Sequence, residues 1–140
     1  MNARGARALD AREHALLAAE AASDKKAVDL IAMNVADQLV VTDYFVIATG
    51  TSDRHVATIA EAVERRMRDA GVHCIGREGE REARWILLDF GDVVMHVFQP
   101  AEREFYRLDK LWNDAERLAL PEEIASPETA GAGAGAPDGE

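Results

Sequence analysis

The feature that most constrains this fold is a strand-rich segment from Trp85 to Phe98. Two runs of β-branched, aliphatic and aromatic residues flank the short sequence Asp89-Phe90-Gly91-Asp92. Phe90-Gly91 at the tip is typical of a two-residue hairpin loop, because glycine adopts the positive φ angles that such loops require. The segment therefore predicts an antiparallel β-hairpin.

The predicted hairpin has two unlike faces. Pairing Trp85 with His96 and Leu88 with Val93 places opposed residues on the same face, and successive residues alternate between faces. One face is wholly apolar and is expected to lie in the core; it carries Ile86, Leu88, Val93, Met95 and Val97. The other face mixes apolar, aromatic and acidic side chains; it carries Trp85, Leu87, Asp89, Asp92, Val94 and His96. This mixed face predicts a contact surface.

Length and composition indicate one domain. The chain has 140 residues, which is enough for a modest core. It contains no run of about 18 apolar residues, so no membrane span is expected. The arginines near the N-terminus are not followed by a continuous apolar stretch, which argues against a signal peptide. Cys74 is the single cysteine, so no internal disulfide is expected, and we predict a cytoplasmic protein.

The charge is acidic and unevenly distributed. The formal net charge is −10, from 16 Lys and Arg against 26 Asp and Glu. This balance is unsuited to gripping nucleic acid through its phosphates and better suited to a basic partner. Residues 121–140 contain acids but no Lys or Arg, and they end in alternating Gly and Ala. We therefore predict a folded domain over residues 1–120 and a disordered acidic tail over 121–140.

Upstream of the hairpin, the pattern predicts two helices and two strands. Residues 1–24 are alanine-rich and favour a weakly amphipathic helix. Strands are predicted at 28–35 and 43–49. The second is expected to be covered on both faces, because apolar residues occur at both odd and even positions along it. Ser52 is expected to cap the next helix, and Gly71 to end it. The apolar stripe of that helix consists of Val56, Ile59, Ala60, Val63 and Met67.

The elements next to the hairpin complete an α/β pattern. Residues 72–75 predict a short strand, and a polar loop over 76–82 leads into the hairpin. After Pro100 we expect a single helix that ends before Pro121. Its predicted buried side carries Phe105, Leu108, Leu111, Trp112, Ala115 and Leu118. Strands and helices interleaved in this way predict an α/β domain.

Several local patterns invite an enzymatic interpretation, and each has a structural alternative. Asp89-Phe90-Gly91 copies the magnesium-binding tripeptide of protein kinases, but no other part of that signature is present, so we interpret it as a hairpin turn. His14, His55 and His73 stand without the spacing of a metal site. Cys74 has apolar neighbours and no nucleophile motif. We predict no catalytic residue, metal ligand or cofactor.

The strongest enzymatic alternative is a phosphate-binding loop at Gly50-Thr51-Ser52. It lies between a predicted strand and a predicted helix, where free N–H groups can cradle a phosphate. Nucleotidyltransferases begin in this way, and they then need neighbouring carboxylates to hold magnesium. The available pair, Asp89 and Asp92, lies across a hairpin tip instead. An ordinary capped helix is the competing interpretation, and a nucleotide-binding enzyme stays as the alternative function.

Four blocks of the sequence together resemble the ribosomal silencing factor (RsfS, Iojap-like) family. They are Thr42–Val56, Glu78-Gly79, Trp85–Phe98 and Arg103–Trp112, in the family's order and spacing. The resemblance covers about residues 10–115 and stops before the acidic tail. Two small departures occur: Met95 stands where the family usually has valine, and Asp109 where it usually has glutamate.

This resemblance implies a translation repressor that is not an enzyme. Family members bind protein L-fourteen of the large ribosomal subunit and block joining of the small subunit when nutrients are scarce. The implied fold is a mixed β-sheet with helices packed on it, related to nucleotidyltransferases but without their catalytic carboxylates. No cofactor, membrane contact or direct nucleic-acid specificity is implied. The oligomeric state stays open, with a homodimer as one option.

The mixed face of the hairpin is the expected partner-binding surface. Trp85 is the expected anchor, since large aromatic residues dominate interface energies. The rest of the predicted surface comprises Leu87 and Val94 beside it, an acidic rim of Glu78, Asp89 and Asp92, His96, and Tyr106 from the last helix. Two alternatives remain: Trp85 could be a core position covered by a helix, and His96 could simply hydrogen-bond a neighbour.

Overall fold

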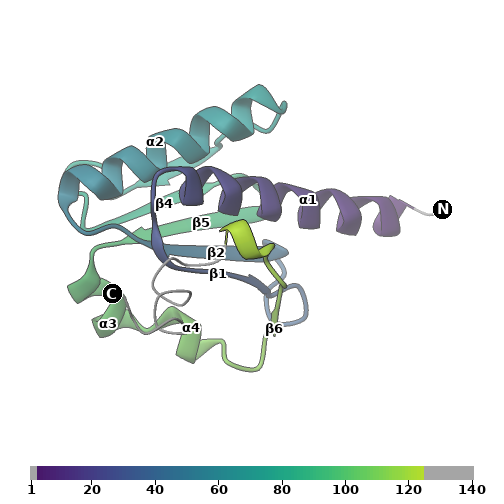
Figure 1. Ribbon diagram of the computed structural model, residues 1–140. Coiled ribbons are helices and arrows are strands. Elements are labelled where there is room, and N and C mark those ends of the chain that lie inside the picture. Colours follow the sequence, from purple (N-terminus) through teal and green to yellow (C-terminus); the bar gives the residue numbers. More distant parts are fainter. Residues whose placement is uncertain (1–2, 125–140) are drawn as a thin grey trace.

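The computed structural model describes residues 3–124, which form one twisted sheet with helices on both faces (Figure 1). The helices are α1 (Ala3–Asp24), α2 (Asp53–Asp69), α3 (Pro100–Tyr106) and α4 (Leu108–Leu111), followed by a 3₁₀ turn, η1, at Glu122–Ile124. The strands are β1 (Val28–Asn34), β2 (Tyr44–Thr49), β3 (Gly76–Glu78), β4 (Trp85–Asp89), β5 (Val93–Phe98) and β6 (Glu116–Arg117).

The sheet is mixed, with the strand order β3-β4-β5-β2-β1-β6. β2 and β5 pair in parallel at its centre, and the other neighbours pair antiparallel. All six residues of β2 are buried, as expected of a central strand covered on both sides. The predicted class, an α/β fold with helices packed on a mixed sheet, is confirmed.

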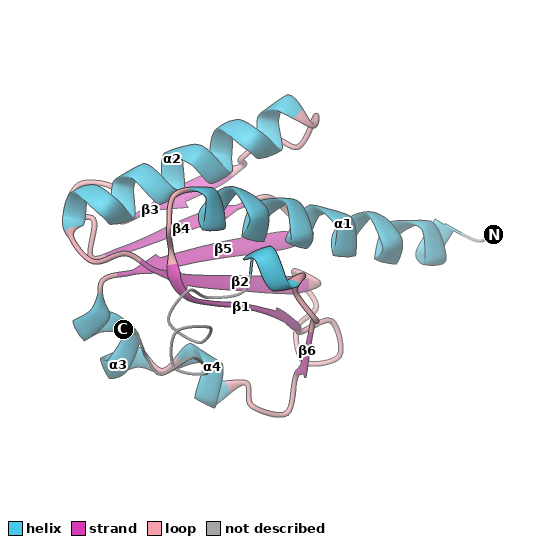
Figure 2. Ribbon diagram, viewed as in Figure 1, coloured by secondary structure: helices cyan, strands magenta, loops and turns pink. Residues whose placement is uncertain are grey.

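α1 and α2 cover one face of the sheet (Figure 2). The predicted stripe of α2 is buried, and Ser52 caps the helix by accepting the N–H of His55 on its Oγ at 3.0 Å. α1 packs through alanines; Ala11, Ala15 and Ala22 are completely buried. Their spacing of four and seven residues places them on one helix face. Because this face consists of small alanines, the helix is only weakly amphipathic, as predicted.

α3 and α4 lie on the opposite face, and here the prediction of one long helix was wrong. Arg107 adopts a left-handed conformation with φ of 50°, which ends α3 and redirects the chain. The new direction brings Trp112 edge-on to Phe45, with ring centroids 6.1 Å apart. The chain then forms β6 against β1, and Leu118 packs with the core on the α1 side. Because the expected helix is broken, Phe105 remains 78% exposed.

The hairpin exists, but its predicted register was wrong by two residues. Trp85 pairs with Phe98 and Leu87 with His96, and the turn is closed by a 2.9 Å hydrogen bond from Phe90 N–H to the Val93 carbonyl. Gly91 and Asp92 are thus the loop residues. Phe90 leaves the loop because it is buried in the core, 6% exposed. A shift of two preserves which face each strand residue occupies, so the apolar face is buried as predicted.

Two other boundaries differ from the prediction. The strand expected at 72–75 lies instead at β3, where Gly76 pairs with Asp89 and Glu78 with Leu87. At the other end, Ile124 is buried against the core beside α1, so ordered structure continues past residue 120. Residues 125–140, the greater part of the predicted tail, lie outside the described chain.

Candidate functional site on the open face of the sheet

The face opposite α1 and α2 is only partly covered. α3 and α4 lie over β1, β2 and β5 and bury a second apolar cluster that includes Met33, Phe45, Ile47 and Phe98. Trp85 and Val94 are partly buried at its margin, and Leu87 is partly buried on the same strand face as Trp85. We call the surface formed by Trp85, Leu87, Val94, Phe105 and Tyr106 the aromatic patch.

Trp85 organises this patch. Its ring centroid lies 4.8 Å from that of Phe98 and 4.6 Å from that of Tyr106. Its indole N–H donates to Nδ1 of His96 at 3.2 Å. The side chain is therefore half-buried and held by neighbours on β5 and α3, a position between the two alternatives of exposed anchor and helix-covered core. Such fixed aromatic side chains lose little entropy when a partner covers them.

His96 lies beneath the patch and is 4% exposed. Desolvation by burial lowers the pKa of His96 from 6.5 to about 4, so the ring is neutral near pH 7. The indole can only donate, so Nδ1 must accept and the proton must reside on Nε2. Within residues 3–124 this buried Nε2 has no hydrogen-bond partner. His96 thus acts as a support for Trp85, and its burial keeps it from the surface.

The predicted acidic rim is divided between the two sides of the sheet. Glu78 is exposed and is paired with Leu87, which places it on the face of the patch. Asp89 is partly buried and holds the turn by accepting the N–H of Gly91 at 2.8 Å. The face assignment of Asp92 was wrong: its Oδ2 lies 2.8 Å from Nδ1 of His14 on α1. The sequence could not indicate this contact, because 78 residues separate the pair.

α3 contributes more to the patch than the sequence predicted. Tyr106 is 46% exposed and rests on Trp85, as expected of a residue that reaches the surface. Phe105 was expected inside but is more exposed than Tyr106, and the two rings meet edge-on at 5.0 Å. No local signal marks Phe105 as a surface residue, because its exposure depends on the helix break at Arg107.

The Gly50-Thr51-Ser52 loop does not have the geometry of a phosphate cradle. The N–H of Gly50 donates to the Phe98 carbonyl and that of Thr51 to Nδ1 of His55, both at 2.8 Å. His55 in turn contacts the Lys25 carbonyl through Nε2 at 2.7 Å. These contacts occupy two of the donors that a phosphate would need and tie α2 to the end of α1.

The carboxylates also lie at the wrong end of the sheet. Asp92 precedes Val93, which pairs with Tyr44 at the start of β2, whereas the Gly50 loop follows Thr49 at its end. Five residue steps of about 3.3 Å separate the two ends by roughly 16 Å. Among residues 3–124 no group of three His, Cys, Asp or Glu is placed to hold a metal ion.

No helix in the same range is long and apolar enough to cross a membrane.

Fold and site together define a small α/β protein with a partly open aromatic face, a surface composition typical of interaction proteins. A family model described as "Ribosomal silencing factor during starvation" matches residues 8–138. The ribosomal silencing factor RsfS of Bacillus subtilis is 44% identical over 99 residues, which span 71% of this chain and 84% of that protein. The chloroplastic protein Iojap of Zea mays is 35% identical over 106 residues, spanning 74% of this chain and 45% of that protein.

Solved structures agree. A Chromobacterium violaceum protein of 34% identity superimposes with a TM-score of 0.71 over 83% of this chain and 96% of its own. A Bacillus halodurans protein of 38% identity superimposes with a TM-score of 0.66 over 74% of this chain and 94% of its own. The chain therefore belongs to the ribosomal silencing factor family, which confirms the resemblance seen in its four sequence blocks. Its functional class is regulation of translation through the ribosome.

Proposed function

We propose that this protein represses translation in the cytoplasm by binding protein L-fourteen of the large ribosomal subunit through its aromatic patch. Bound there, it blocks joining of the small subunit by occupying space, under nutrient limitation. Family membership supplies the ribosome as the target. The structure supports the proposal with a surface that fits a protein partner. We propose action by occupying space because the proposal assigns no catalytic residue to the protein.

The observation that carries the proposal is the continuous row of aromatic rings from Phe98 through Trp85 to Tyr106 and Phe105. Phe105 and Tyr106 remain 78% and 46% exposed although they adjoin a packed core. Rigid, partly exposed aromatic groups of this kind are the usual anchors of protein interfaces. Glu78 beside Leu87 offers an acidic border, which suits a basic ribosomal protein.

Truncation of Tyr106 tests the patch directly. Tyr106→Ala is expected to leave the fold intact, because the side chain is nearly half exposed on a short helix. Binding to isolated L-fourteen and to large subunits is expected to weaken by about 2 kcal/mol, or roughly thirtyfold. Leu87→Asp, which places a charge in the patch, is expected to weaken binding at least as much. Co-sedimentation and calorimetry measure both.

Thr58→Asp is the matched control, since it adds the same charge to the exposed side of α2 on the other face of the sheet. It is expected to bind normally. Inhibition of subunit joining by the intact protein should follow the fraction of large subunits occupied and reverse on dissociation. Normal binding by both patch variants would refute the assigned surface, and substoichiometric inhibition would refute action by occupancy.

A further inference from the structure

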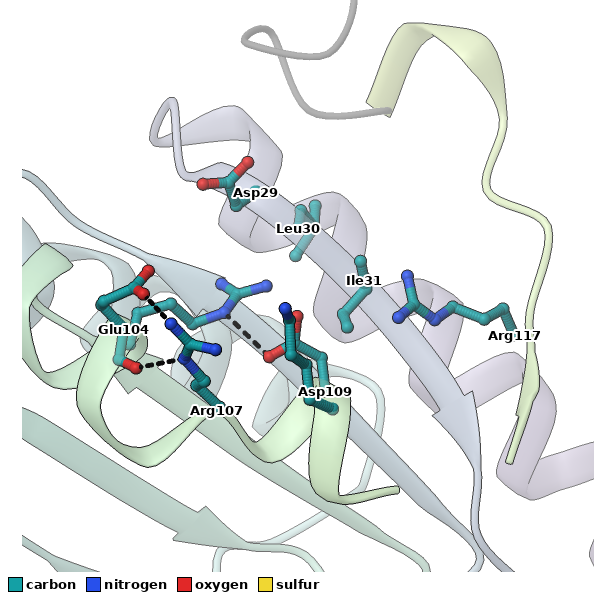
Figure 3. A pocket seen from close by; sticks show the side chains of 9 residues that line it. Asp29, Leu30, Ile31, Glu104, Arg107, Asp109 and Arg117 are labelled. Atoms are coloured by element: carbon teal, nitrogen blue, oxygen red, sulfur yellow. Dashed lines mark hydrogen bonds and ion pairs between the residues drawn. The ribbon is translucent and has the colours of Figure 1, made fainter. Parts of the chain in front are cut away.

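A polar groove of about 380 Å³ lies at the opposite end of the strand order from the patch strand β4, between β1, β6 and the α3–α4 segment (Figure 3). Leu30 and Ile31 of β1 are among the residues that line it. Its charged lining consists of Asp29, Arg103, Glu104, Arg107, Asp109, Lys110 and Arg117. Four cations in one groove are notable in a protein whose formal net charge is −10.

Two of the four cations have carboxylate partners within the groove. Arg107 is paired with Glu104, and Arg103 lies 3.6 Å from Asp109. Among the described side chains, those of residues 10–122 and 124, no carboxylate lies within 4.0 Å of Lys110 or Arg117. Figure 3 shows the Arg117 guanidinium reaching from β6 toward Ile31 and Asp109. Both free cations are on exposed residues, so a ligand can reach them.

Arg103 adds a largely buried positive charge behind them. Its side chain is 12% exposed and donates to Oγ1 of Thr49 at 2.8 Å, a neutral acceptor. Burial lowers the pKa of Arg103, and the positive charge of Arg117 lowers it further. The carboxylates of Asp109 and Asp29 act in the opposite direction and raise it. The net direction is downward, so the nearby carboxylates do not fully compensate this guanidinium. An anion in the groove would supply the missing compensation.

We propose that this groove binds a phosphate group through Lys110 and Arg117, with Arg103 behind them. Resting on the proposed function, the phosphate belongs to the backbone of ribosomal RNA beside the L-fourteen contact. An acidic protein is repelled by RNA at most of its surface, so a local cation pair fixes where the two can touch. Phosphate contacts of this kind position a protein without reading sequence, which agrees with the expected lack of nucleic-acid specificity.

The phosphate site itself is tested with inorganic phosphate as the probe. Amide NMR signals of the full chain are followed during addition of phosphate at constant ionic strength. Signals of Lys110 and Arg117 are expected to shift in a saturable way, and the double variant Lys110→Gln/Arg117→Gln is expected to lose these shifts. Because both side chains are exposed, the variant should fold normally, as its remaining amide spectrum reports. Absence of shifts in the groove, or equal shifts in the variant, overturns the proposal.

The RNA source is tested by salt dependence. The affinity of the double variant for large subunits should fall about tenfold at low salt. Its slope of log affinity against log salt should decrease by about one to two, as for the loss of one or two phosphate contacts. The control Arg54→Gln/Arg65→Gln removes two exposed arginines of α2, on the other face of the sheet. It should leave both quantities unchanged, because its charges do not line the groove.

Isolated L-fourteen separates this inference from the proposed function. The double variant should bind that protein like the intact chain, whereas Tyr106→Ala should not. An unchanged salt slope with retained phosphate binding would leave a site for free phosphate and overturn the RNA assignment. A different result would refute the proposed function but support the phosphate site. In that case the intact protein would not bind L-fourteen, while Lys110→Gln/Arg117→Gln would still weaken the salt-dependent binding to large subunits.

Discussion

The pair of Trp85 and His96 shows how one buried residue positions a partly buried one. The indole N–H is held by Nδ1 of His96, and the histidine is held neutral by its burial. Protonation would remove the acceptor and place a charge among Phe45, Trp85 and Phe98, whose rings surround it. The orientation of Trp85 in the aromatic patch therefore depends on a residue that is itself buried beneath it.

Stability should depend on pH through His96. Its pKa is about 4 in the folded protein and about 6.5 when unfolded, so the unfolded chain binds more protons between these values. The resulting stability is present above pH 6.5 and is lost as the pH falls toward 4. Between pH 7 and pH 5 the free energy of unfolding should fall by about 2 kcal/mol from this group.

Urea unfolding of the intact protein and His96→Gln at both pH values measures this contribution. The variant is expected to be less stable at pH 7 but to lose about 2 kcal/mol less on acidification. The comparison cancels the contributions of all other groups, because both proteins share them. Equal losses in the two proteins would show that His96 already charges in the folded state.

At the scale of elements, the connection between β3 and β4 fixes the backbone on which Trp85 stands. Gly79 follows β3 with φ of 83°, and its carbonyl accepts the N–H of Ala83 at 2.9 Å. A Cβ atom at this position would lie 1.9 Å from the carbonyl oxygen of Trp85. Glycine is required here both for its conformation and for the close approach of two backbone segments.

Gly79→Ala is therefore expected to be strongly destabilising. The positive φ alone costs about 1 kcal/mol for a residue with a side chain, and the clash with Trp85 adds at least about 2 kcal/mol more. Gly71→Ala is the matched control, because Gly71 has φ of 85° with nothing within 4 Å of its added Cβ. In urea unfolding, Gly71→Ala should cost only about 1 kcal/mol, whereas Gly79→Ala should cost more. Similar costs for both variants would contradict the backbone contact.

At the scale of the whole molecule, the two faces of the sheet differ in how much of their surface is buried in a core. The face under α1 and α2 contains the larger core and closes at Ile124, which is 8% exposed. The other face combines a smaller core with two surface features: the aromatic patch, centred on Trp85 of β4, and the polar groove, beside β1 and β6. Residues 125–140 add three acids and no large apolar side chain, so they offer no anchor for a partner.

Two truncations separate the roles of Ile124 and the residues after it. Removal of 125–140 is expected to leave the unfolding free energy and the large-subunit affinity unchanged within about threefold. Removal of 121–140 also deletes the buried Ile124 and is expected to cost about 2 kcal/mol of stability. Thermal or urea unfolding with co-sedimentation measures both. A tenfold loss of affinity in the shorter truncation would instead make the acidic segment part of the interface.

Patterns that depend on near neighbours were predictable. The stripe and cap of α2 follow from helical spacing, and the two hairpin faces follow from strand alternation. A register error of two residues left those faces correct, because side-chain direction repeats every second residue. The four family blocks likewise identified the family from sequence alone.

Contacts between distant segments were decided only by the tertiary structure. Phe90 leaves the hairpin loop because the core has room for its ring, and Asp92 turns toward His14 because α1 packs above it. The last helix breaks at Arg107 because Trp112 gains a contact with Phe45. Each outcome depends on which surface meets the residue after folding, and local spacing carries no information about that surface.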